Sequence, residues 1–406
     1  MKIGIVGLGY IGSVTAVALT EAGYEIVGID IDESKVKSLS NGEPTIFEPN
    51  LKELLTKNKS KLFFSTDYDD LKDVQYIFVV VPTPNKDGSI YLEYVYDAVS
   101  SIKKVNKNAV IIIKSTVLPG TARNLMERTG MVVISNPEFT KEGTAIEDTL
   151  HPDRVVIGGS EKSAVDAVKK LWEFTHSIMV ETTNENAEMI KYASNSFLAV
   201  KISFINEIAN ICEMVPGCDV EVVAKGMGLD KRIAPYFLKA GIGFGGSCFP
   251  KDTTAILSFA RSFGEDLSII KSAIEVNNDR VNRIMNILKN KIHKDNSEVT
   301  VGVLGMTFKA GTDDTRESQS IKLIRSLLDV GYKVNVYDPM AKIRIDGITR
   351  LNTAKECIDK SDVAVIATEW PEFKNLEINT DKFVIDMRRM LDLNSHSNLK
   401  TVGYYG

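Results

Sequence analysis

A single cysteine stands directly after a glycine-rich segment, in the stretch Gly243-Phe244-Gly245-Gly246-Ser247-Cys248-Phe249-Pro250-Lys251-Asp252. A thiol after such a bend can reach whatever occupies the bend, and the nearby Lys251 ammonium favours the nucleophilic thiolate. Asp252 follows four residues later, one helical turn on if a helix begins there. Placement alone fits a small buried thiol behind a flexible loop equally well, so a nucleophile and a structural cysteine both stay open.

A second pattern, Gly7-x-Gly9-x-x-Gly12, lies between an apolar stretch and a helical one. Its first glycine permits a tight turn, its second lets a pyrophosphate approach the backbone, and its third lets helix and strand pack closely. Asp30 comes 18 residues after the last glycine, where its carboxylate can bind an adenosine ribose, and no arginine lies within Ile31–Lys35. The pattern predicts a site for NAD rather than NADP; a glycine turn without a ligand is the alternative.

A lysine and an asparagine four residues apart, Lys191 and Asn195, share one face of a predicted, mostly apolar helix. They either mark its solvent side or point into a cleft. In a cleft, an ammonium and an amide N–H can stabilise an oxygen on which negative charge develops.

Two further polar segments follow predicted strands. Asn136–Gly143 carries Glu138 and Glu142, and two carboxylates at the end of a strand can position water or ribose hydroxyls. Thr307–Ser318 carries Lys309 and Arg316, which can bind phosphates.

The elements that position these residues follow from apolar runs of strand length that alternate with helical stretches. This alternation predicts a parallel sheet covered on both faces. The runs are 2–6, 25–30, 74–81, 109–114 and 131–135. We expect a helix at Ser13–Ala22 and one long helix at Asn184–Met214, which connects two domains or forms an oligomer interface.

Four segments in the last third of the chain resemble segments of the first third, in the same order. Segment 298–305 resembles 2–7, 331–338 resembles 23–30, 361–367 parallels 73–81, and 383–387 parallels 109–114. Any two parallel-sheet domains share some likeness, but four echoes in one order favour two related domains. Because the second copy lacks GxGxxG, we do not expect it to bind a second dinucleotide in the same manner.

We therefore expect an α/β protein in which two Rossmann-like doubly wound parallel-sheet domains are joined by a central helical domain. The expected boundaries are 1–183 for the N-terminal NAD-binding domain, 184–296 for the central helical domain and 297–406 for the C-terminal Rossmann-like domain.

Composition excludes several classes. The 406 residues carry 49 Lys and Arg against 54 Asp and Glu, with no basic excess that would indicate nucleic acid as the main partner. Four cysteines make no disulfide framework. Four histidines show no metal spacing, and one of them, His396, lies outside the residues that the structure describes. No apolar run approaches about 18 residues, so no membrane span is expected. We expect a cytoplasmic enzyme.

Together these segments closely resemble the nucleotide-sugar 6-dehydrogenases over essentially the whole chain. The most specific is Gly-Gly-Ser-Cys-x-Pro-Lys-Asp, which favours the nucleophile for Cys248. The other matching segments are the N-terminal GxGxxG, 47–51, 81–84, 115–117, 136–143, 151–154, 191–207 and 308–318.

The resemblance implies oxidation of a primary alcohol to a carboxylate with two NAD+ and one water. It also implies that the helical domain 184–296 forms a homodimer and that the C-terminal domain 297–406 binds a UDP-sugar. His151-Pro152-Asp153-Arg154 and Gly-Gly-Ser-Cys-Phe resemble the UDP-glucose branch more than the branches for GDP-mannose or UDP-N-acetylmannosamine. A non-catalytic NAD-binding regulator would have no reason to keep the lysine, asparagine, cysteine and aspartate together.

By motif position the resemblance also implies a site. The implied catalytic residues are Cys248 as nucleophile, with Thr116, Glu138, Lys191, Asn195 and Asp252 around the reacting oxygen or an ordered water. The implied NAD contacts are Gly7, Gly9, Tyr10, Ile11, Gly12, Asp30, Lys35, Thr83, Thr116, Glu142, Lys251 and Arg316. The implied sugar-nucleotide contacts are Glu138, Phe139, Thr140, Lys141, Glu142, Lys191, Asn195, Phe237, Leu238, Lys239, Gly241, Phe244, Gly245, Lys309 and Arg388, with Arg232 reaching into the partner subunit's sugar site. No metal is implied.

Overall fold

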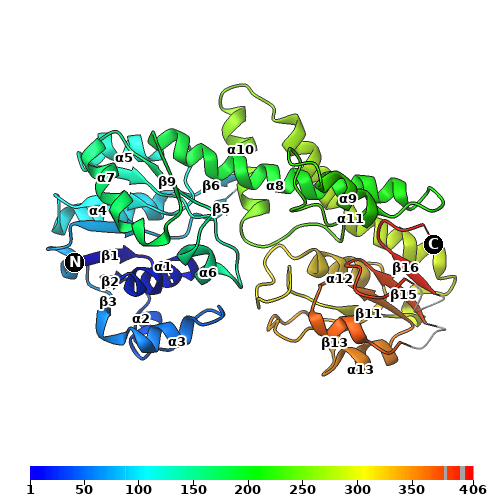
Figure 1. Ribbon diagram of the computed structural model, residues 1–406. Helices are drawn as coiled ribbons and strands as arrows, with labels where there is room; N and C mark the ends of the chain where they lie inside the picture. Colours follow the sequence, from blue (N-terminus) through cyan, green and yellow to red (C-terminus); the bar gives the residue numbers. More distant parts are fainter. Residues whose placement is uncertain (87, 379–381, 394–397, 406) are drawn as a thin grey trace. The chain divides into compact units, whose positions relative to one another are not determined.

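A computed structural model describes residues 1–86, 88–378, 382–393 and 398–405 (Figure 1). The chain divides into two compact units, Met1–Ser194 and Asn195–Gly406, and each is described by itself. Helix α8 (Asn184–Cys212) contains the boundary between them. The expected three-domain division at 183/184 and 296/297 stays a prediction.

The first unit is built on one sheet with the strand order β10-β9-β8-β7-β4-β1-β2-β3. Neighbouring strands are parallel, except that β8 and β9 meet antiparallel. The strands are β1 (Lys2–Val6), β2 (Glu25–Ile29), β3 (Leu62–Ser65), β4 (Tyr76–Val79), β7 (Val110–Ile113), β8 (Val133–Ser135), β9 (Arg154–Gly158) and β10 (Ile178–Thr182); β5 (Asn85–Lys86) and β6 (Ser89–Ile90) form a separate hairpin.

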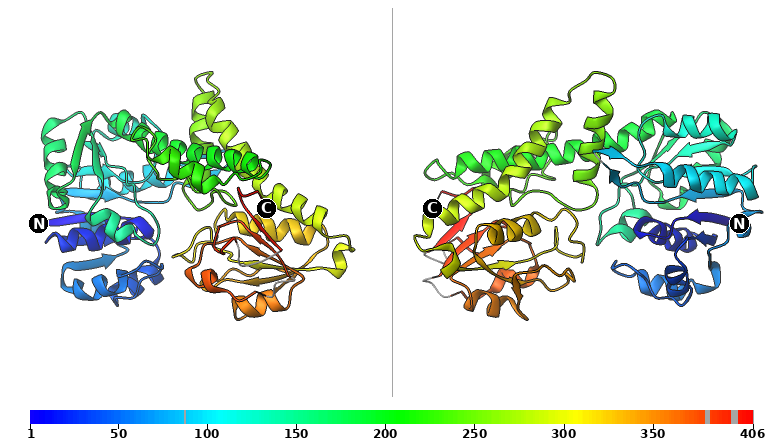
Figure 2. Two further views of the ribbon diagram at one scale, coloured as in Figure 1. Left: turned by 45° about the vertical axis from the view of Figure 1, so that its right-hand side comes forward. Right: turned by 180° about the vertical axis from the view of Figure 1, so that it is seen from behind.

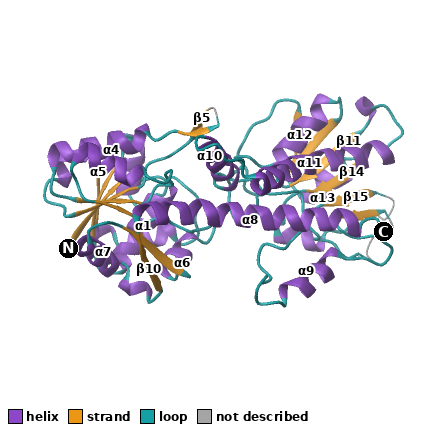
Figure 3. Ribbon diagram, turned by 90° about the horizontal axis from the view of Figure 1, so that it is seen from above, coloured by secondary structure: helices purple, strands orange, loops and turns teal. Residues whose placement is uncertain are grey.

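Helices cover both faces of this sheet, as predicted (Figure 3). One apolar core packs α1, α3, α6 and α7 on one face, and a second core packs α4 and α5 on the other. The helices are α1 (Tyr10–Glu21), α2 (Glu33–Ser40), α3 (Leu51–Lys57), α4 (Glu93–Val105), α5 (Thr121–Thr129), α6 (Ala145–Leu150) and α7 (Lys162–Leu171), with short 3₁₀ turns at Lys59–Lys61, Tyr68–Leu71 and Glu173–Thr175.

The second unit carries a parallel sheet in the order β13-β12-β11-β14-β15-β16 (Figure 2). Its strands are β11 (Thr300–Leu304), β12 (Lys333–Tyr337), β13 (Ile348–Arg350), β14 (Val363–Ile366), β15 (Phe383–Asp386) and β16 (Leu399–Thr401). Its helices are α9 (Val220–Gly228), α10 (Phe249–Arg261), α11 (Ser268–Lys291), α12 (Gln319–Asp329) and α13 (Ala354–Asp359), with 3₁₀ turns at Asn296–Glu298 and Pro371–Asn375.

The two sheets confirm the similarity between the first and last thirds of the sequence. The first contains the order β7-β4-β1-β2-β3 and the second the order β15-β14-β11-β12-β13, so equivalent strands occupy equivalent places. This is the doubly wound, Rossmann-like arrangement, in which ligands bind at the carboxyl ends of the strands.

Several element boundaries differ from the sequence prediction by one to three residues, and two of them have a clear local cause. Helix α1 begins at Tyr10 rather than Ser13, because Gly9 is already its N-cap and the last glycine of the motif lies in the first helical turn. Helix α8 ends at Cys212 rather than Met214, since the chain tightens there into a turn in which the N–H of Met214 donates to the carbonyl of Ile211, 2.9 Å away. In the described part of the chain, no helix is both long and apolar enough to cross a bilayer.

Candidate active site

The glycine turn after β1 has the shape that a dinucleotide needs. Gly7 has a φ of +96°, and a Cβ there would lie 2.7 Å from the carbonyl oxygen of Val80. A Cβ on Gly12 would lie 1.9 Å from the carbonyl oxygen of Gly7, so only glycine lets strand and helix approach this closely. A Cβ on Gly9 would meet nothing within 4 Å. No side chain caps α1, so its N-terminal N–H groups and dipole suit a pyrophosphate.

Asp30 is fixed at the carboxyl end of β2, beside this turn. Its Oδ2 accepts a 2.8 Å hydrogen bond from the N–H of Leu8 and pairs with the ammonium of Lys35, also at 2.8 Å. Its Oδ1 accepts from the N–H of Asp32 at 3.1 Å. A negative group held here suits ribose hydroxyls and repels a 2′-phosphate, so the residues present fit NAD.

The equivalent aspartate of the second sheet, Asp338, has a different environment. Its carboxylate accepts hydrogen bonds from the N–H groups of Met306, Thr307, Met340 and Ala341, from the Thr307 hydroxyl and from the Trp370 indole. Because backbone N–H groups from two loops and the Trp370 indole all donate to it, Asp338 is a structural brace for the loop that replaces the glycine turn.

The loop after β8 holds a buried ion pair. The Lys191 ammonium lies 2.7 Å from Oε1 of Glu138 and 2.7 Å from the Glu138 carbonyl oxygen. Oε2 of Glu138 accepts 2.6 Å bonds from the N–H and hydroxyl of Thr140. Burial raises the Glu138 pKa, but the Lys191 charge and the hydrogen bonds from Lys191 and Thr140 outweigh it and hold the pKa at about 2. Lys191 is thus buried and paired, and the solvent-side alternative is wrong for it.

Two predicted cofactor residues, one after β4 and one after β7, are joined by a hydrogen bond. The hydroxyl of Thr83 donates to the carbonyl of Thr116 at 2.9 Å. Two substrate-loop residues are also fixed: the Arg154 guanidinium stacks 3.8 Å from the centre of the Phe139 ring, and the N–H of Lys141 donates to Asp148 at 2.9 Å. Glu142 lies in the same loop. The first unit therefore gathers its predicted residues at the carboxyl ends of its strands.

Cys248 is exposed and is the N-cap residue of α10. A helix N-terminus stabilises a thiolate. The N–H of Asp252 donates to the carbonyl of Cys248 at 2.8 Å, so one helical turn separates them, as predicted. Burial raises the pKa of Cys212 to about 11 and that of Cys357 to about 12, which keeps both thiols protonated at neutral pH.

Asp252 is fully buried and holds two predicted site residues. Its Oδ2 accepts a 2.6 Å hydrogen bond from the amide of Asn195, and its Oδ1 pairs with the Lys251 ammonium. Since Asn195 is turned toward a buried carboxylate, the solvent-side alternative is wrong for it as well. No group of histidine, cysteine and carboxylate side chains suited to a metal occurs among the described residues.

The glycine-rich loop before Cys248 is held tightly within the second unit. A Cβ on Gly245 would lie 2.4 Å from the carbonyl oxygen of Glu317, and the N–H of Gly246 donates to the Arg316 carbonyl at 3.0 Å. Gly241 borders Met387 and Arg388, since its Cβ would meet atoms of both within 3.3 Å. The loop thus joins the predicted segment 308–318 and Arg388 into one group.

The remaining predicted residues of this unit lie around that group or outside it. Phe237 has a φ of 63°, and its ring centre lies 6.1 Å from that of Phe249. Leu238 is buried. Lys239 follows it in the segment that leads to Cys248, and Lys309 lies in the segment 308–318. Arg232 stands apart: its side chain is 88% exposed and pairs with Asp230 at 2.6 Å.

Several residues that support the site were missed by sequence reasoning. The side chain of Asn277 accepts a 2.7 Å hydrogen bond from the backbone N–H of Phe244 and donates one of 3.0 Å to the Phe244 carbonyl. Glu48 accepts from the N–H of Gly143 at 2.8 Å and from the hydroxyl of Tyr10, and so ties the Glu142 loop to α1. For Asn277 the available signal was a polar residue among the apolar positions of α11, whereas Glu48 lies in the loop before α3, inside the matching segment 47–51.

Comparisons with known proteins cover nearly the whole chain. The UDP-glucose/GDP-mannose dehydrogenase family matches by its NAD binding domain at residues 1–176, its central domain at 185–279 and its UDP binding domain at 302–393. UDP-glucose 6-dehydrogenase YwqF of Bacillus subtilis is 41% identical over 93% of this chain and 90% of its own length. UDP-glucose 6-dehydrogenase AglM of Haloferax volcanii is 38% identical over 96% of this chain and 97% of its own.

Solved structures agree. A UDP-glucose dehydrogenase from Pyrobaculum islandicum is 35% identical, with a TM-score of 0.93 over 100% of this chain and 97% of that one. A UDP-D-ManNAc dehydrogenase from Pyrococcus horikoshii is 29% identical, with a TM-score of 0.89 over 99% of both chains. The chain is therefore an NAD-binding dehydrogenase that belongs to the UDP-glucose/GDP-mannose dehydrogenase family.

Proposed function

We propose that this chain oxidises UDP-glucose to UDP-glucuronate with two NAD+ and one water. The observation that carries the proposal is Cys248, an exposed thiol at the N-terminus of α10 with the buried Asp252 one turn away. The full-length likeness to proteins named UDP-glucose 6-dehydrogenase supports this sugar over others.

In this mechanism NAD+, when bound, accepts one hydride in each of two oxidations. The C6 hydroxyl first loses its proton to water held by Asp252, which leaves an aldehyde once hydride departs. The Cys248 thiolate then adds to the aldehyde carbon, and the oxygen gains a proton to give a thiohemiacetal. Lys191 and Asn195 stabilise negative charge on that oxygen.

Loss of the second hydride and of the hydroxyl proton converts the thiohemiacetal into a thioester. Water, positioned with Thr116 and Glu138, attacks the thioester carbon, and the carbon–sulfur bond breaks to release the carboxylate and return the thiol. Covalent capture divides one difficult oxidation into easier steps and retains a reactive aldehyde. A reducing compartment keeps Cys248 available, so we also propose that the protein acts in the cytoplasm.

The test is a substrate panel of UDP-glucose, UDP-N-acetylmannosamine and GDP-mannose, followed by NADH absorbance. UDP-glucose is expected to give two NADH per sugar consumed, because only a four-electron oxidation needs the cysteine. One NADH with released aldehyde would contradict the covalent mechanism. A clear preference for UDP-N-acetylmannosamine or for GDP-mannose would instead assign the chain to the branch of the family that oxidises that sugar. The solved UDP-D-ManNAc dehydrogenase is a precedent for the first of these.

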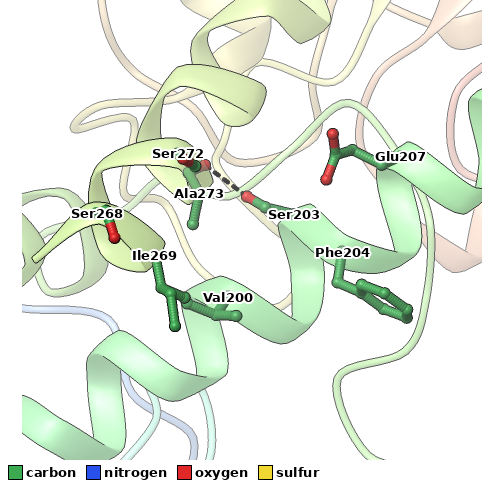
Figure 4. Close-up of a pocket in the computed structure, with 8 residues that line it drawn as sticks. All are labelled: Val200, Ser203, Phe204, Glu207, Ser268, Ile269, Ser272 and Ala273. Carbon is green, nitrogen blue, oxygen red and sulfur yellow. Dashed lines mark hydrogen bonds between the residues drawn. The ribbon is translucent and has the colours of Figure 1, made fainter.

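We also propose that the chain forms a homodimer through its central helices. Phe197, Phe204 and Ile211 recur every seven residues on α8 and are 64%, 44% and 59% exposed. Beside them, α8 and α11 border a pocket of about 300 Å³, bridged by a 2.6 Å bond from the Ser203 hydroxyl to the Ala273 carbonyl (Figure 4). An exposed apolar stripe of this kind is typical of a surface that another subunit covers.

Phe204→Glu is expected to shift the molecular mass in solution, measured by light scattering, from twice the chain mass toward one chain. Two carboxylates at a self-associating stripe repel each other and lose hydration. Val330→Glu, at an equally exposed apolar residue outside α8, serves as the control and should leave the mass unchanged. A monomeric wild-type protein would rule the dimer out.

A further inference from the structure

The first turns of α8 carry a buried polar face that the proposed mechanism uses only in part. Asn184, Glu188 and Lys191 follow each other at spacings of four and three residues, so they lie on one side of the helix. Asn184 accepts from the N–H of Ser135 at 2.9 Å and donates to the carbonyl of Val133 at 3.2 Å. Lys191 holds Glu138. Glu188 lies between them and has no assigned role.

Glu188 joins the ends of two strands to α8. Its Oε2 accepts a 2.7 Å hydrogen bond from the N–H of Gly120, and its Oε1 accepts 3.0 Å bonds from the N–H of Ala122 and the hydroxyl of Ser135. Gly120 and Ala122 follow β7 and the Thr116 segment, while Ser135 ends β8 and leads into the Glu138 loop. One carboxylate therefore spans both loops, one turn before Lys191.

The charged and titratable groups around Glu188 come from its own helix and from α4 and α5. Glu188 is 3% exposed, and among the described residues no lysine or arginine forms an ion pair with it. Glu185 on its own helix is a like charge. On α5, Arg123 pairs with Glu185 at 2.6 Å, and Arg128 lies 4.7 Å from the centre of the Tyr96 ring. On α4, Glu188 faces the phenol of Tyr96. Burial raises the Glu188 pKa to about 7, although the bonds from Ala122, Gly120 and Ser135 oppose the rise.

We propose that Glu188 is a positioning residue whose ionised form holds the Thr116 segment and the Glu138 loop in register with Lys191, so that its protonation lowers turnover. The inference rests on the proposed function. All three hydrogen bonds point toward the carboxylate, and they use both oxygens. A protonated oxygen presents an O–H donor to the groups that donate to it. Protonation of Oε2 therefore weakens the hydrogen bond from Gly120, and protonation of Oε1 weakens those from Ala122 and Ser135.

The test compares kcat and KM from pH 5.5 to 9 in the wild type and in Glu188→Gln. The amide imitates the protonated acid, so kcat at pH 8 is expected to fall about 10- to 100-fold, the scale of small misplacements in an active site. The decline of wild-type kcat below about pH 7 should disappear from the variant, and KM for UDP-glucose should change by less than about threefold.

Stability separates this role from a merely structural one. The folded protein holds the Glu188 proton more tightly than the unfolded chain does. The free energy of unfolding therefore falls as the pH rises through about 7, and at pH 8 the ionised carboxylate destabilises the fold. Glu188→Gln removes that cost, so its melting temperature at pH 8 should equal or exceed the wild-type value although its activity is lower. Glu185→Gln removes a like charge that raises the Glu188 pKa, so in this variant the acidic decline of kcat should move to lower pH while kcat at pH 8 stays at the wild-type value.

Ser135→Ala provides a second route if Glu188→Gln does not fold. It removes one bond to the carboxylate without changing charge, so the acidic decline of kcat should move to higher pH. The inference is overturned if Glu188→Gln keeps wild-type kcat and its acidic decline, or if Ser135→Ala leaves that decline in place. A wild-type protein that oxidises none of the three sugars would instead refute the proposed function.

Discussion

Cys248→Ser should lower the steady-state rate of NADH formation by at least about 10³-fold, on the order of 4 kcal/mol in barrier. A serine hydroxyl is a far weaker nucleophile than a thiolate near neutral pH. The first oxidation needs no nucleophile, so traces of aldehyde or a stalled adduct are expected, whereas the second oxidation and release of the acid should fail.

Binding of UDP-glucose should survive this substitution, because serine is nearly the same size as cysteine and Cys248 is exposed. NADH absorbance and calorimetry measure the two properties separately. Cys357→Ser and Cys212→Ser are the controls: both thiols are buried, their pKa values are raised to about 12 and about 11, and their variants should keep the rate within a few-fold if folded. Near-normal turnover of Cys248→Ser would remove the covalent mechanism, and lost binding would indicate a structural cysteine.

Wild-type kcat/KM should favour NAD+ over NADP+ by about 10² or more, close to 3 kcal/mol. The Asp30 carboxylate would face the 2′-phosphate, and its placement is fixed by the N–H of Leu8 and the ammonium of Lys35, each at 2.8 Å. A like charge held at close range in a partly buried site costs binding energy that water does not fully screen.

Asp30→Asn should narrow this preference at least tenfold. The amide oxygen can still accept from the N–H of Leu8, while the negative charge is lost and the Lys35 ammonium can turn to a phosphate. Adding Lys35→Ala should then reverse the gain with NADP+. Initial rates with both cofactors measure the ratio; equal wild-type efficiency with both would show that Asp30 does not contact the ribose.

The local sequence was sufficient for features that depend on backbone constraints. At Gly7 and Gly12 a Cβ would collide with the backbone, so glycine spacing alone identified the turn and Asp30 identified the strand end beside it. The echo between the two halves was likewise readable, because buried parallel strands need unbroken apolar runs. The start of α1 was misplaced by three residues, since a glycine turn and a first helical turn share the same residues.

Other features could not be read locally. Strands β9 and β10 were not predicted. They extend the first sheet beyond β8, where β9 pairs antiparallel with β8. Spacing placed Lys191 and Asn195 on one helix face but left solvent or cleft open for both. Their partners, Glu138 and Asp252, lie 53 and 57 residues away in the chain, and only folding decided that both side chains are buried and paired.

The sequence by itself determined the glycine turn for NAD and the doubled Rossmann-like sheet, because both depend on neighbouring residues or on a short periodic pattern. The class of protein and the choice of Cys248 among the cysteines came from the family resemblance of the sequence. Tertiary structure alone decided which carboxylates are held ionised and which are not. Glu138 pairs with an ammonium and its pKa is about 2. Glu188, on the same helix as that ammonium, accepts hydrogen bonds from N–H and O–H groups, pairs with no cation among the described residues, and its pKa is about 7. The physical reason is that burial penalises both charges alike, and only a full opposite charge, brought from a distant part of the chain, outweighs that penalty.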